Sequence, residues 1–184
     1  AGKGNNMADQ TKARRDAEWA LRDIALRYVT ATGGTVADRP ISPVGNYGSH
    51  RAAEPLAGIR AAQVFKHAAA RLDHEYLRYA RQDGASWDDI GAALGMKFVP
   101  ETGRTAAEHA YEHAAGEPAQ WSDPRSFYYD CGSCAQGVTD HGPYESHPHD
   151  RESGHADTCT RMTAEVDAWQ AQRDAEDAQW EAGQ

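Results

Sequence analysis

Three cysteines and one histidine in the last third of the chain have the types and spacing of metal ligands. Cys131 and Cys134 are separated by two residues, and His155 and Cys159 complete the pattern Cys-x2-Cys-x20-His-x3-Cys. Thiolate sulfur and imidazole nitrogen are the ligands of tetrahedral zinc, and four of them close its coordination sphere. The sequence therefore predicts one structural Zn2+ ion bound by Cys131, Cys134, His155 and Cys159.

Local features support this ligand set. The run from Cys131 to Gly137 has the form of a zinc knuckle, in which we expect Gly137 to take the left-handed backbone that such turns often need. The i, i+4 spacing of His155 and Cys159 predicts that both lie on one face of the first turn of a final helix. Three other histidines, on a Pro/Gly-rich loop, are alternatives to His155 as the fourth ligand or as a second metal site: His141, His147 and His149.

Other chemistry fits the sequence less well. A thioredoxin-like redox pair at Cys131 and Cys134 would lack a βαβ setting and would leave Cys159 unexplained. A catalytic zinc needs an open coordination position, and the nucleobase-deaminase pattern is absent because Asp130 precedes Cys131 and no His-x-Glu lies in register upstream. The sequence has no nucleophile elbow, P-loop or dinucleotide motif. We therefore expect a protein that is not an enzyme, and we identify no small-molecule substrate.

Composition limits the class of protein. The 184 residues, 40% of them hydrophobic, suffice for one core or for a core with a small satellite. No run approaches the roughly 20 apolar residues of a membrane span, and no signal-peptide pattern is visible, so we expect a cytoplasmic protein without membrane contact. The net charge of −9 is uneven, being +1 over 7–50, −2 over 51–120 and −9 over 121–184. Nucleic-acid binding would therefore have to involve the upstream segments.

The elements that would position these groups are mostly helices. Periodicity predicts helices over 9–31, 58–82, 105–115 and 160–180, and Ser86 with Asp89 predicts a capping box on a short helix over 87–94. The first helix would bury a stripe formed by Ala17, Leu21, Ile24 and Tyr28, and the second would bury one formed by Phe65, Ala68, Ala69, Leu72, Tyr76 and Tyr79. Residues 35–55 read as a loop, and 126–129 as a strand. The fold we predict is mostly α, with one small zinc-stabilised β-hairpin packed against the last helix. Its parts are 1–6, a tag remnant; 7–57, an N-terminal helix and a Pro/Gly-rich arm; 58–120, a helical domain; and 121–184, a zinc-binding module with the C-terminal helix.

The run from Ala80 to Met96 resembles the first half of helix-turn-helix units that are common in regulators from high-GC actinobacteria. In that resemblance Trp87, Ile90 and Leu94 anchor the first helix, Gly91 is small where two helices cross, and Gly95 takes the turn. Residues 97–103 then intervene before the candidate second helix. The resemblance implies that DNA is contacted near the start of that helix, with Lys97, Arg104, Thr105 and His109 as candidate residues.

The two parts together resemble small actinobacterial proteins, often associated with plasmids or phages, that join a helix-turn-helix unit to a zinc-ribbon-like or treble-clef segment. The matching residues are Ser86 to Met96, Cys131, Cys134, Asp140, Gly142, Pro143, Gly154, His155 and Cys159. The resemblance implies a DNA-binding protein active in transcription regulation, with a structural zinc site. The alternative is a protein–protein interaction module on the same scaffold, whose acidic C-terminal surface docks a basic partner or a second copy in a homodimer.

Overall fold

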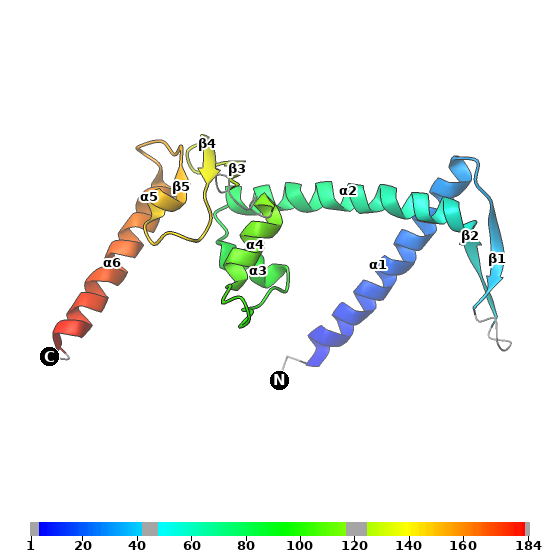
Figure 1. The fold of residues 1–184 in the computed structure, drawn as a ribbon, viewed down its shortest axis with the longest axis horizontal. Helices are drawn as coiled ribbons and strands as arrows, with labels where there is room; N and C mark the ends of the chain where they lie inside the picture. Colours follow the sequence, from blue (N-terminus) through cyan, green and yellow to red (C-terminus); the bar gives the residue numbers. More distant parts are fainter. Residues whose placement is uncertain (1–3, 42–47, 117–124, 183–184) are drawn as a thin grey trace. The chain divides into compact units, whose positions relative to one another are not determined.

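A computed structural model describes residues 4–41, 48–116 and 125–182 of the chain (Figure 1). These ranges are mostly helical, as predicted, and they contain two small antiparallel sheets. Their elements in chain order are α1 (Gly4–Ala31), β1 (Val36–Pro40), β2 (Ser49–Ala53), α2 (Pro55–Gln82), α3 (Trp87–Ala93), α4 (Ala106–Ala115), β3 (Phe127–Asp130), β4 (Gly137–Asp140), α5 (Pro148–Arg151), β5 (Glu152–Ser153) and α6 (Thr160–Ala182). Among the described helices, none is long and apolar enough to cross a membrane.

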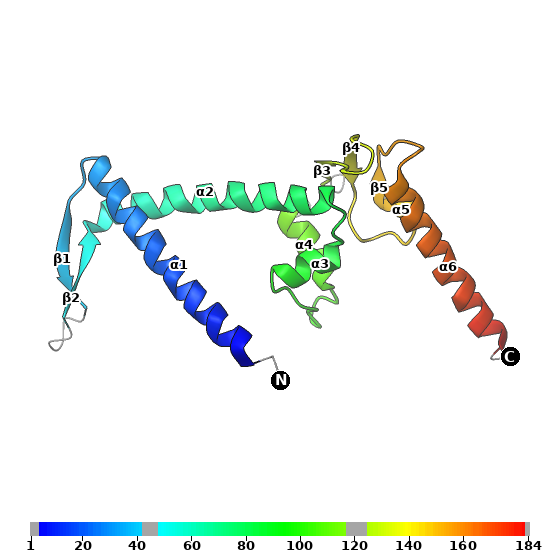
Figure 2. The ribbon, with the colours of Figure 1, turned by 180° about the vertical axis from the view of Figure 1, so that it is seen from behind.

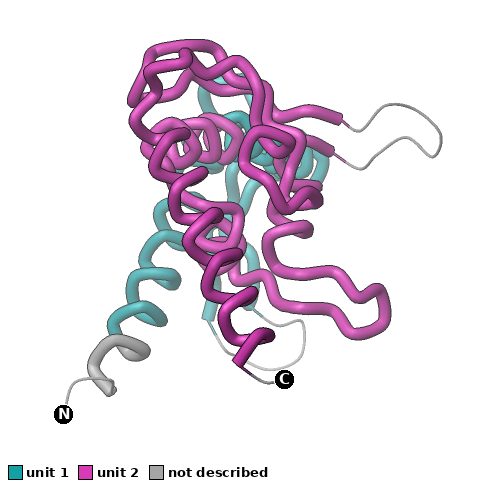
Figure 3. The backbone as a smooth tube through the Cα atoms, turned by 90° about the vertical axis from the view of Figure 1, so that its left-hand side faces the viewer, with its two compact units in different colours: residues 1–71 teal, residues 72–184 magenta. Residues whose placement is uncertain are grey.

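The chain separates into two compact units, which Figure 3 shows in different colours. Unit 1 comprises residues 1–71 and unit 2 comprises residues 72–184. The division falls inside α2, whereas the sequence predicted boundaries after residues 57 and 120. The second of these boundaries, like residues 1–3 of the predicted tag, lies outside the described residues. Residues 4–6 of that predicted tag belong to α1.

Unit 1 contains a β-hairpin in the segment that the sequence predicted as a loop. β1 pairs antiparallel with β2, with Val36 opposite Ala53 and Pro40 opposite Ser49 (Figure 1). The prediction of a loop was wrong. The segment shows no alternation of apolar and polar residues, so no local pattern indicated that the two strands would pair. Pro40, which cannot donate to a ladder, stands at the end of its strand.

The two apolar stripes predicted on α1 and α2 are largely exposed, which corrects the sequence prediction. Leu21 of α1 and Tyr76 of α2 keep 54% and 63% of their accessible surface. Among the described residues of unit 1, Val29, Ala57 and Ala61 are buried. Apolar spacing identifies a helix, but the element that packs against it decides which face is buried.

Two short helices at the start of unit 2 form as the sequence predicted. Ser86 caps α3 and Thr105 caps α4, each through a complete capping box, with Asp89 and Glu108 at the third helical position. A Cβ at Gly91 would lie 2.7 Å from the carbonyl oxygen of Ala106, so α3 and α4 cross closely at this glycine. The segment between the helices closes on an isolated antiparallel bridge from Val99 to Arg104.

The rest of unit 2 is a three-stranded antiparallel sheet of order β3-β4-β5 and the helix α6. Phe127 pairs with Asp140 at one end of the β3–β4 ladder, and Asp130 pairs with Gly137 at the other. α5 and β5 lead into α6, as seen from behind in Figure 2. One hydrophobic core joins the helices to the sheet; it contains Leu77, Trp87, Ile90, Ala107, Ala110, Tyr111, Phe127, Tyr129, Cys131, Val138, Cys159 and Met162.

Candidate metal centre

The four predicted ligands come together at one end of the unit 2 sheet. The candidate donor atoms of Cys131, Cys134, His155 and Cys159 all lie within 4.8 Å of one another. The Cys131 and Cys159 sulfurs are 3.8 Å apart, and His155 Nδ1 lies 3.4 Å from the Cys159 sulfur and 3.7 Å from that of Cys134. This Cys3His group is a candidate site for one metal ion.

Cys131 and Cys134 lie on a tight turn that joins β3 to β4. The Cys131 amide donates to the Gln136 carbonyl, and the Ala135 amide donates to the Cys131 carbonyl. The left-handed residue of this turn is Ala135, with φ 55°, and not Gly137, which pairs in the first position of β4. The expectation for Gly137 was therefore wrong, because the ladder already begins at that residue.

Gly132, between the two cysteines, fixes this turn against the end of α2. Its amide donates to the Gln82 carbonyl at 3.0 Å, and a Cβ at Gly132 would lie 2.7 Å from that same oxygen. Any side chain at this position would push the knuckle away from the helix. Close backbone packing therefore requires glycine at position 132, whereas the two thiols face the candidate metal position.

His155 and Cys159 precede α6, which begins only at Thr160. The prediction that both lie in the first turn of a helix was wrong, since residues 154–159 form a turn in which the Cys159 amide donates to the Ala156 carbonyl. The spacing nevertheless brings the side chains together. Gly154, at φ 98°, begins the turn, and a Cβ there would lie 2.5 Å from the Gly137 carbonyl oxygen.

Backbone amides around the cluster favour the thiolate form at two of the three sulfurs. Hydrogen bonds from the Ala156 and Gln136 amides lower the pKa of Cys134 to about 6. Burial raises the pKa of Cys159, but the hydrogen bond from the Met162 amide and other polar contacts outweigh it, so that the net shift is downward. Burial raises the pKa of the Cys131 thiol. The thiolate is the form that binds metal, so the amides prepare Cys134 and Cys159 as ligands.

A buried carboxylate orients the imidazole of His155. His155 Nε2 lies 2.8 Å from Glu152 Oε2, which leaves Nδ1 toward the sulfurs. Burial lowers the pKa of His155, but the hydrogen bond to Glu152, the charge of that carboxylate and the contacts with the Cys134 and Cys159 sulfurs together outweigh burial, so that the net shift is upward. A carboxylate on the far nitrogen of a metal-binding histidine fixes the ring and increases its basicity. Glu152 was not predicted from the sequence, although an acidic residue three positions before His155 was a usable indication.

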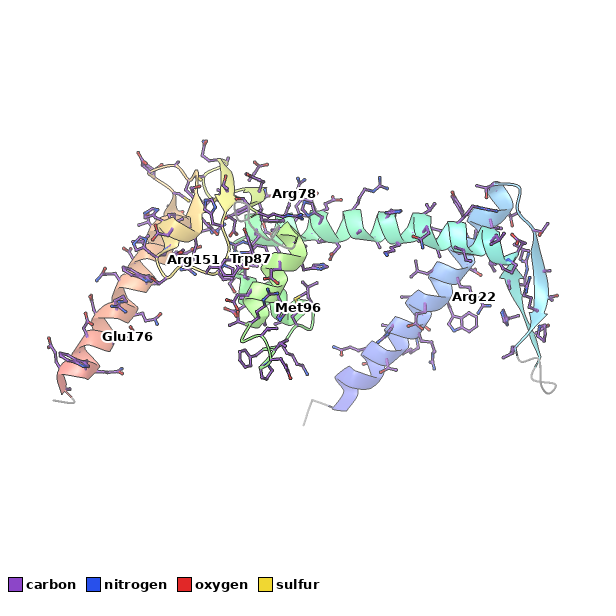
Figure 4. All side chains as sticks on the ribbon, viewed as in Figure 1. Arg22, Arg78, Trp87, Met96, Arg151 and Glu176 are labelled. Atoms are coloured by element: carbon purple, nitrogen blue, oxygen red, sulfur yellow. The ribbon has the colours of Figure 1, made fainter. Side chains whose placement is uncertain are left out.

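Glu152 also belongs to a buried ion network that holds unit 2 together. Arg81, at the end of α2, bonds Asp140 at 2.9 Å and also bonds Glu152. Arg161 of α6 donates to Glu152 at 2.8 Å. Trp87 of α3, labelled in Figure 4, donates from Nε1 to Asp140 at 3.0 Å. The candidate ligand His155 is therefore connected through Glu152 and Arg81 to the helices that precede the sheet.

The pKa values of the two buried carboxyl groups in this network shift in opposite directions. Burial raises the pKa of Asp140 despite the attraction of Arg81. Burial also acts to raise the pKa of Glu152, but two guanidinium groups, those of Arg81 and Arg161, bring it below its ordinary value. Sequence patterns did not identify Arg81, which looks like an ordinary helix arginine until the fold buries it.

The three alternative histidines lie outside the ligand cluster. His141 Nε2 is 3.3 Å from the Ser153 hydroxyl, and the His147 ring packs on Trp169 with centroids 4.5 Å apart. His149 stacks on His147. In the part of the chain that the structure describes, the Cys3His group is the one set of three or more histidine, cysteine and acidic residues whose donor atoms converge on a metal position.

The four candidate DNA-binding residues lie on or just before α4, and they differ in exposure and in their partners. Lys97 is exposed, and Thr105 is the cap of α4. Arg104 forms an ion pair with Glu112 at 2.6 Å. His109 is half-buried, and its Nε2 atom is covered with no hydrogen-bond partner among the described residues.

Comparisons with protein-family models, with curated proteins and with solved structures find no match to this chain.

Proposed function

We propose that the Cys3His group binds one structural zinc ion. A tetrahedral zinc with sulfur at 2.3 Å and nitrogen at 2.0–2.1 Å separates two sulfurs by about 3.8 Å and a sulfur from a nitrogen by about 3.6 Å. The Cys131–Cys159 sulfur distance is 3.8 Å, and the His155 Nδ1 distances are 3.4 and 3.7 Å. Three thiolates with one imidazole form a soft donor set suited to zinc. The four protein ligands fill the sphere, which supports a structural role and not a catalytic one.

The test of the zinc site is elemental analysis of the purified chain and of two variants. Wild-type protein should carry about one zinc per chain, and Cys134→Ser should lose it together with the far-UV and near-UV signals of folded unit 2, since metal binding contributes folding energy directly. His147→Ala is the matched control and should keep the zinc. Retention of zinc and fold by Cys134→Ser, or loss of zinc in His147→Ala, would show that the ligand set is different.

For the whole of unit 2, we propose a zinc-stabilised interaction module that docks a basic segment of a partner protein. The observation that carries this proposal is the charge of the unit: 72–184 contains 22 acidic and 8 basic residues, net −14. Four of the eight basic side chains are already engaged in ion pairs, namely Arg81, Arg104, Arg161 and Arg173. Such a surface attracts cationic partners and repels phosphates.

A groove of about 680 Å³ along α6 is the candidate docking surface of unit 2. Carboxylates line it from three elements: Asp88 of α3, Glu145 of the loop before α5, and Glu165 and Glu176 of α6. Trp169 supplies apolar surface in the same groove. Arg151 and Arg173 also line it, and Arg173 pairs with Glu176 at 3.2 Å. A lysine- or arginine-rich segment fits this combination of carboxylates around an indole.

The docking proposal is tested by binding of a fluorescent lysine-rich peptide to the zinc-loaded chain. Glu176→Lys reverses a charge inside the groove, whereas Glu181→Lys reverses one outside it on the same helix. We expect the first variant to weaken binding by at least fivefold and the second by less than twofold, because a like charge at the contact costs more than a distant screened one. Equal effects of both variants would mean that only net charge is sensed and would refute the groove.

A second candidate function is DNA binding by α3 and α4. The close crossing at Gly91 and the left-handed Gly95 are what the helix-turn-helix resemblance requires. Against it, the Arg104 guanidinium is already paired with Glu112, and the Nε2 atom of His109 is covered. Selection of genomic fragments at low salt tests this candidate: bound fragments whose affinity falls in Arg104→Ala would support it, and the absence of any bound fragment would refute it.

A further inference from the structure

Unit 1 contains a groove of about 730 Å³ between α1 and β2 that the proposed function of unit 2 does not use. Five side chains give it its chemistry: Trp19, Arg22 and Arg27 from α1, with His50 and Arg51 from β2. Arg22 is labelled on α1 in Figure 4. An exposed indole among arginines does not contribute to a hydrophobic core, and it is a combination that nucleic-acid-binding surfaces commonly have.

The Trp19 indole is exposed at the surface, and Arg22 lies beside it. Trp19 keeps 60% of its accessible surface, and the Arg22 guanidinium carbon lies 5.6 Å from the centre of its ring. The same guanidinium donates to the Arg51 carbonyl at 3.3 Å, which ties α1 to β2. Cation–π contact with one residue and a hydrogen bond to another restrict the arginine, so the stacking platform and the cation beside it are already positioned.

The groove is also positively charged, although not uniformly. Residues 1–71 contain 11 basic and 6 acidic residues, net +5. Asp23 lies in the groove and offsets part of the charge of Arg27 through an exposed pair at 3.5 Å. Asp38 stands opposite Arg51 in the hairpin register, but among the described residues no carboxylate lies within ion-pair distance of the exposed Arg51 side chain.

We infer that this groove binds single-stranded nucleic acid, with a base stacked on Trp19 and the backbone phosphates on Arg22, Arg27 and Arg51. Single strands are favoured over a duplex because a base can stack on an indole only when it is not already stacked and paired in a helix. The inference concerns unit 1 alone and is independent of the docking groove of unit 2. With the proposed function of unit 2, unit 1 would bind an anionic partner and unit 2 a cationic one.

The first experiment measures the fluorescence anisotropy of labelled oligothymidine against the full zinc-loaded chain at low salt. Trp19→Ala should weaken binding about fivefold or more, since stacking of one base is worth about 1–3 kcal/mol. Trp180→Ala is the matched control, because Trp180 is another exposed indole, at 70%, on α6. It should bind like wild type. Far-UV circular dichroism confirms that both variants are folded.

The second experiment tests the cations. Three phosphate contacts on a single strand predict that log K falls with log[salt] with a slope of about −2, and Arg51→Ala should make the slope shallower by about 0.7. Arg51→Glu should weaken binding more than Arg14→Glu, which reverses a charge on α1 outside the groove. Measurement against a duplex of the same length completes the set, and the single strand should bind more tightly.

Four results would overturn the inference. The first is absence of any anisotropy change at low salt, and the second is equal affinity of Trp19→Ala and Trp180→Ala. The third is tighter binding of the duplex without dependence on Trp19. The fourth is seen in sedimentation of the protein alone: if Trp19→Ala and Arg51→Glu abolish self-association while oligonucleotide affinity is unchanged, the groove holds a second copy of the chain.

Discussion

Replacing Arg81 by methionine should destabilise unit 2 more than any other single change in its ion network. The Arg81 side chain is 7% exposed and contacts Asp140 and Glu152, which are 1% and 4% exposed. Methionine preserves most of the aliphatic stem and removes the charge. Glu152 keeps Arg161 as a partner, whereas Asp140 keeps only the neutral donors of Trp87 and Gly142.

The magnitude follows from leaving one buried carboxylate without a cation. Removal of one partner from a buried ion pair costs about 3–5 kcal/mol. Because burial already raises the pKa of Asp140, the variant can relieve the charge by taking up a proton. The cost should therefore be largest near neutral pH and should shrink as the pH falls toward the raised pKa of Asp140.

Urea unfolding of the zinc-loaded chain, followed by far-UV circular dichroism, measures this cost. Arg78→Met is the matched control, since Arg78 is an exposed residue of the same helix, and its effect should stay within about 0.5 kcal/mol. Adding Asp140→Asn to Arg81→Met should recover part of the loss, giving a double variant more stable than the sum of the single changes. A cost below about 1 kcal/mol, or equal effects of Arg81→Met and Arg78→Met, would refute the reasoning.

Three further predictions address the site and the local structure. Glu152→Gln should lower zinc affinity about 10- to 100-fold in competition with a chromophoric chelator, and an unchanged affinity relative to a Glu165→Gln control would contradict the orienting role. Gly91→Ala should cost about 1–3 kcal/mol in unfolding experiments because its methyl group meets a backbone carbonyl, whereas Gly58→Ala, in helix α2 with no contact closer than 3.6 Å, should be neutral or stabilising. Glu54 accepts hydrogen bonds from two amides at the start of α2, which lower its pKa, so its contribution to stability is present above its ordinary pKa and is lost as the pH falls below it. Glu54→Gln should therefore lose less stability than wild type between about pH 6 and pH 3, and parallel pH profiles would argue against this.

The local features of unit 2 could be predicted because they depend on residues close in sequence. The capping box at Ser86 needs only a hydroxyl and a carboxylate three residues apart, and α3 begins where it indicated. The box at Thr105 is also local, but only the helix α4 itself was predicted from the sequence. The left-handed turn at Gly95 is equally local. The i, i+4 spacing of His155 and Cys159 gave the correct proximity for the wrong reason, since a turn and not a helix brings them together.

Features that depend on distant partners could not be predicted. The hairpin of unit 1 is a pairing across 36–53 without alternating apolar residues. The exposed face of α1 carries Leu21 and Ile24, which look like core residues in a periodic pattern. Helical spacing shows that a face exists, whereas its burial depends on whether another element is long enough and near enough to cover it.

The candidate metal centre shows the same difference between local and long-range features. The sequence by itself identified Cys131, Cys134 and Cys159 as candidate ligands and limited the fourth to a nearby histidine, because thiol chemistry and the spacing of a knuckle restrict which side chains can converge. Only the tertiary structure decided that His155, and not a histidine of the 141–149 loop, completes the group, and that Glu152 and Arg81 hold it in place. The physical reason is that residue type shows which side chains can bind a metal, whereas the orientation and burial of those side chains depend on groups far away in the chain. Arg81, for example, bonds Glu152 from 71 positions earlier in the sequence.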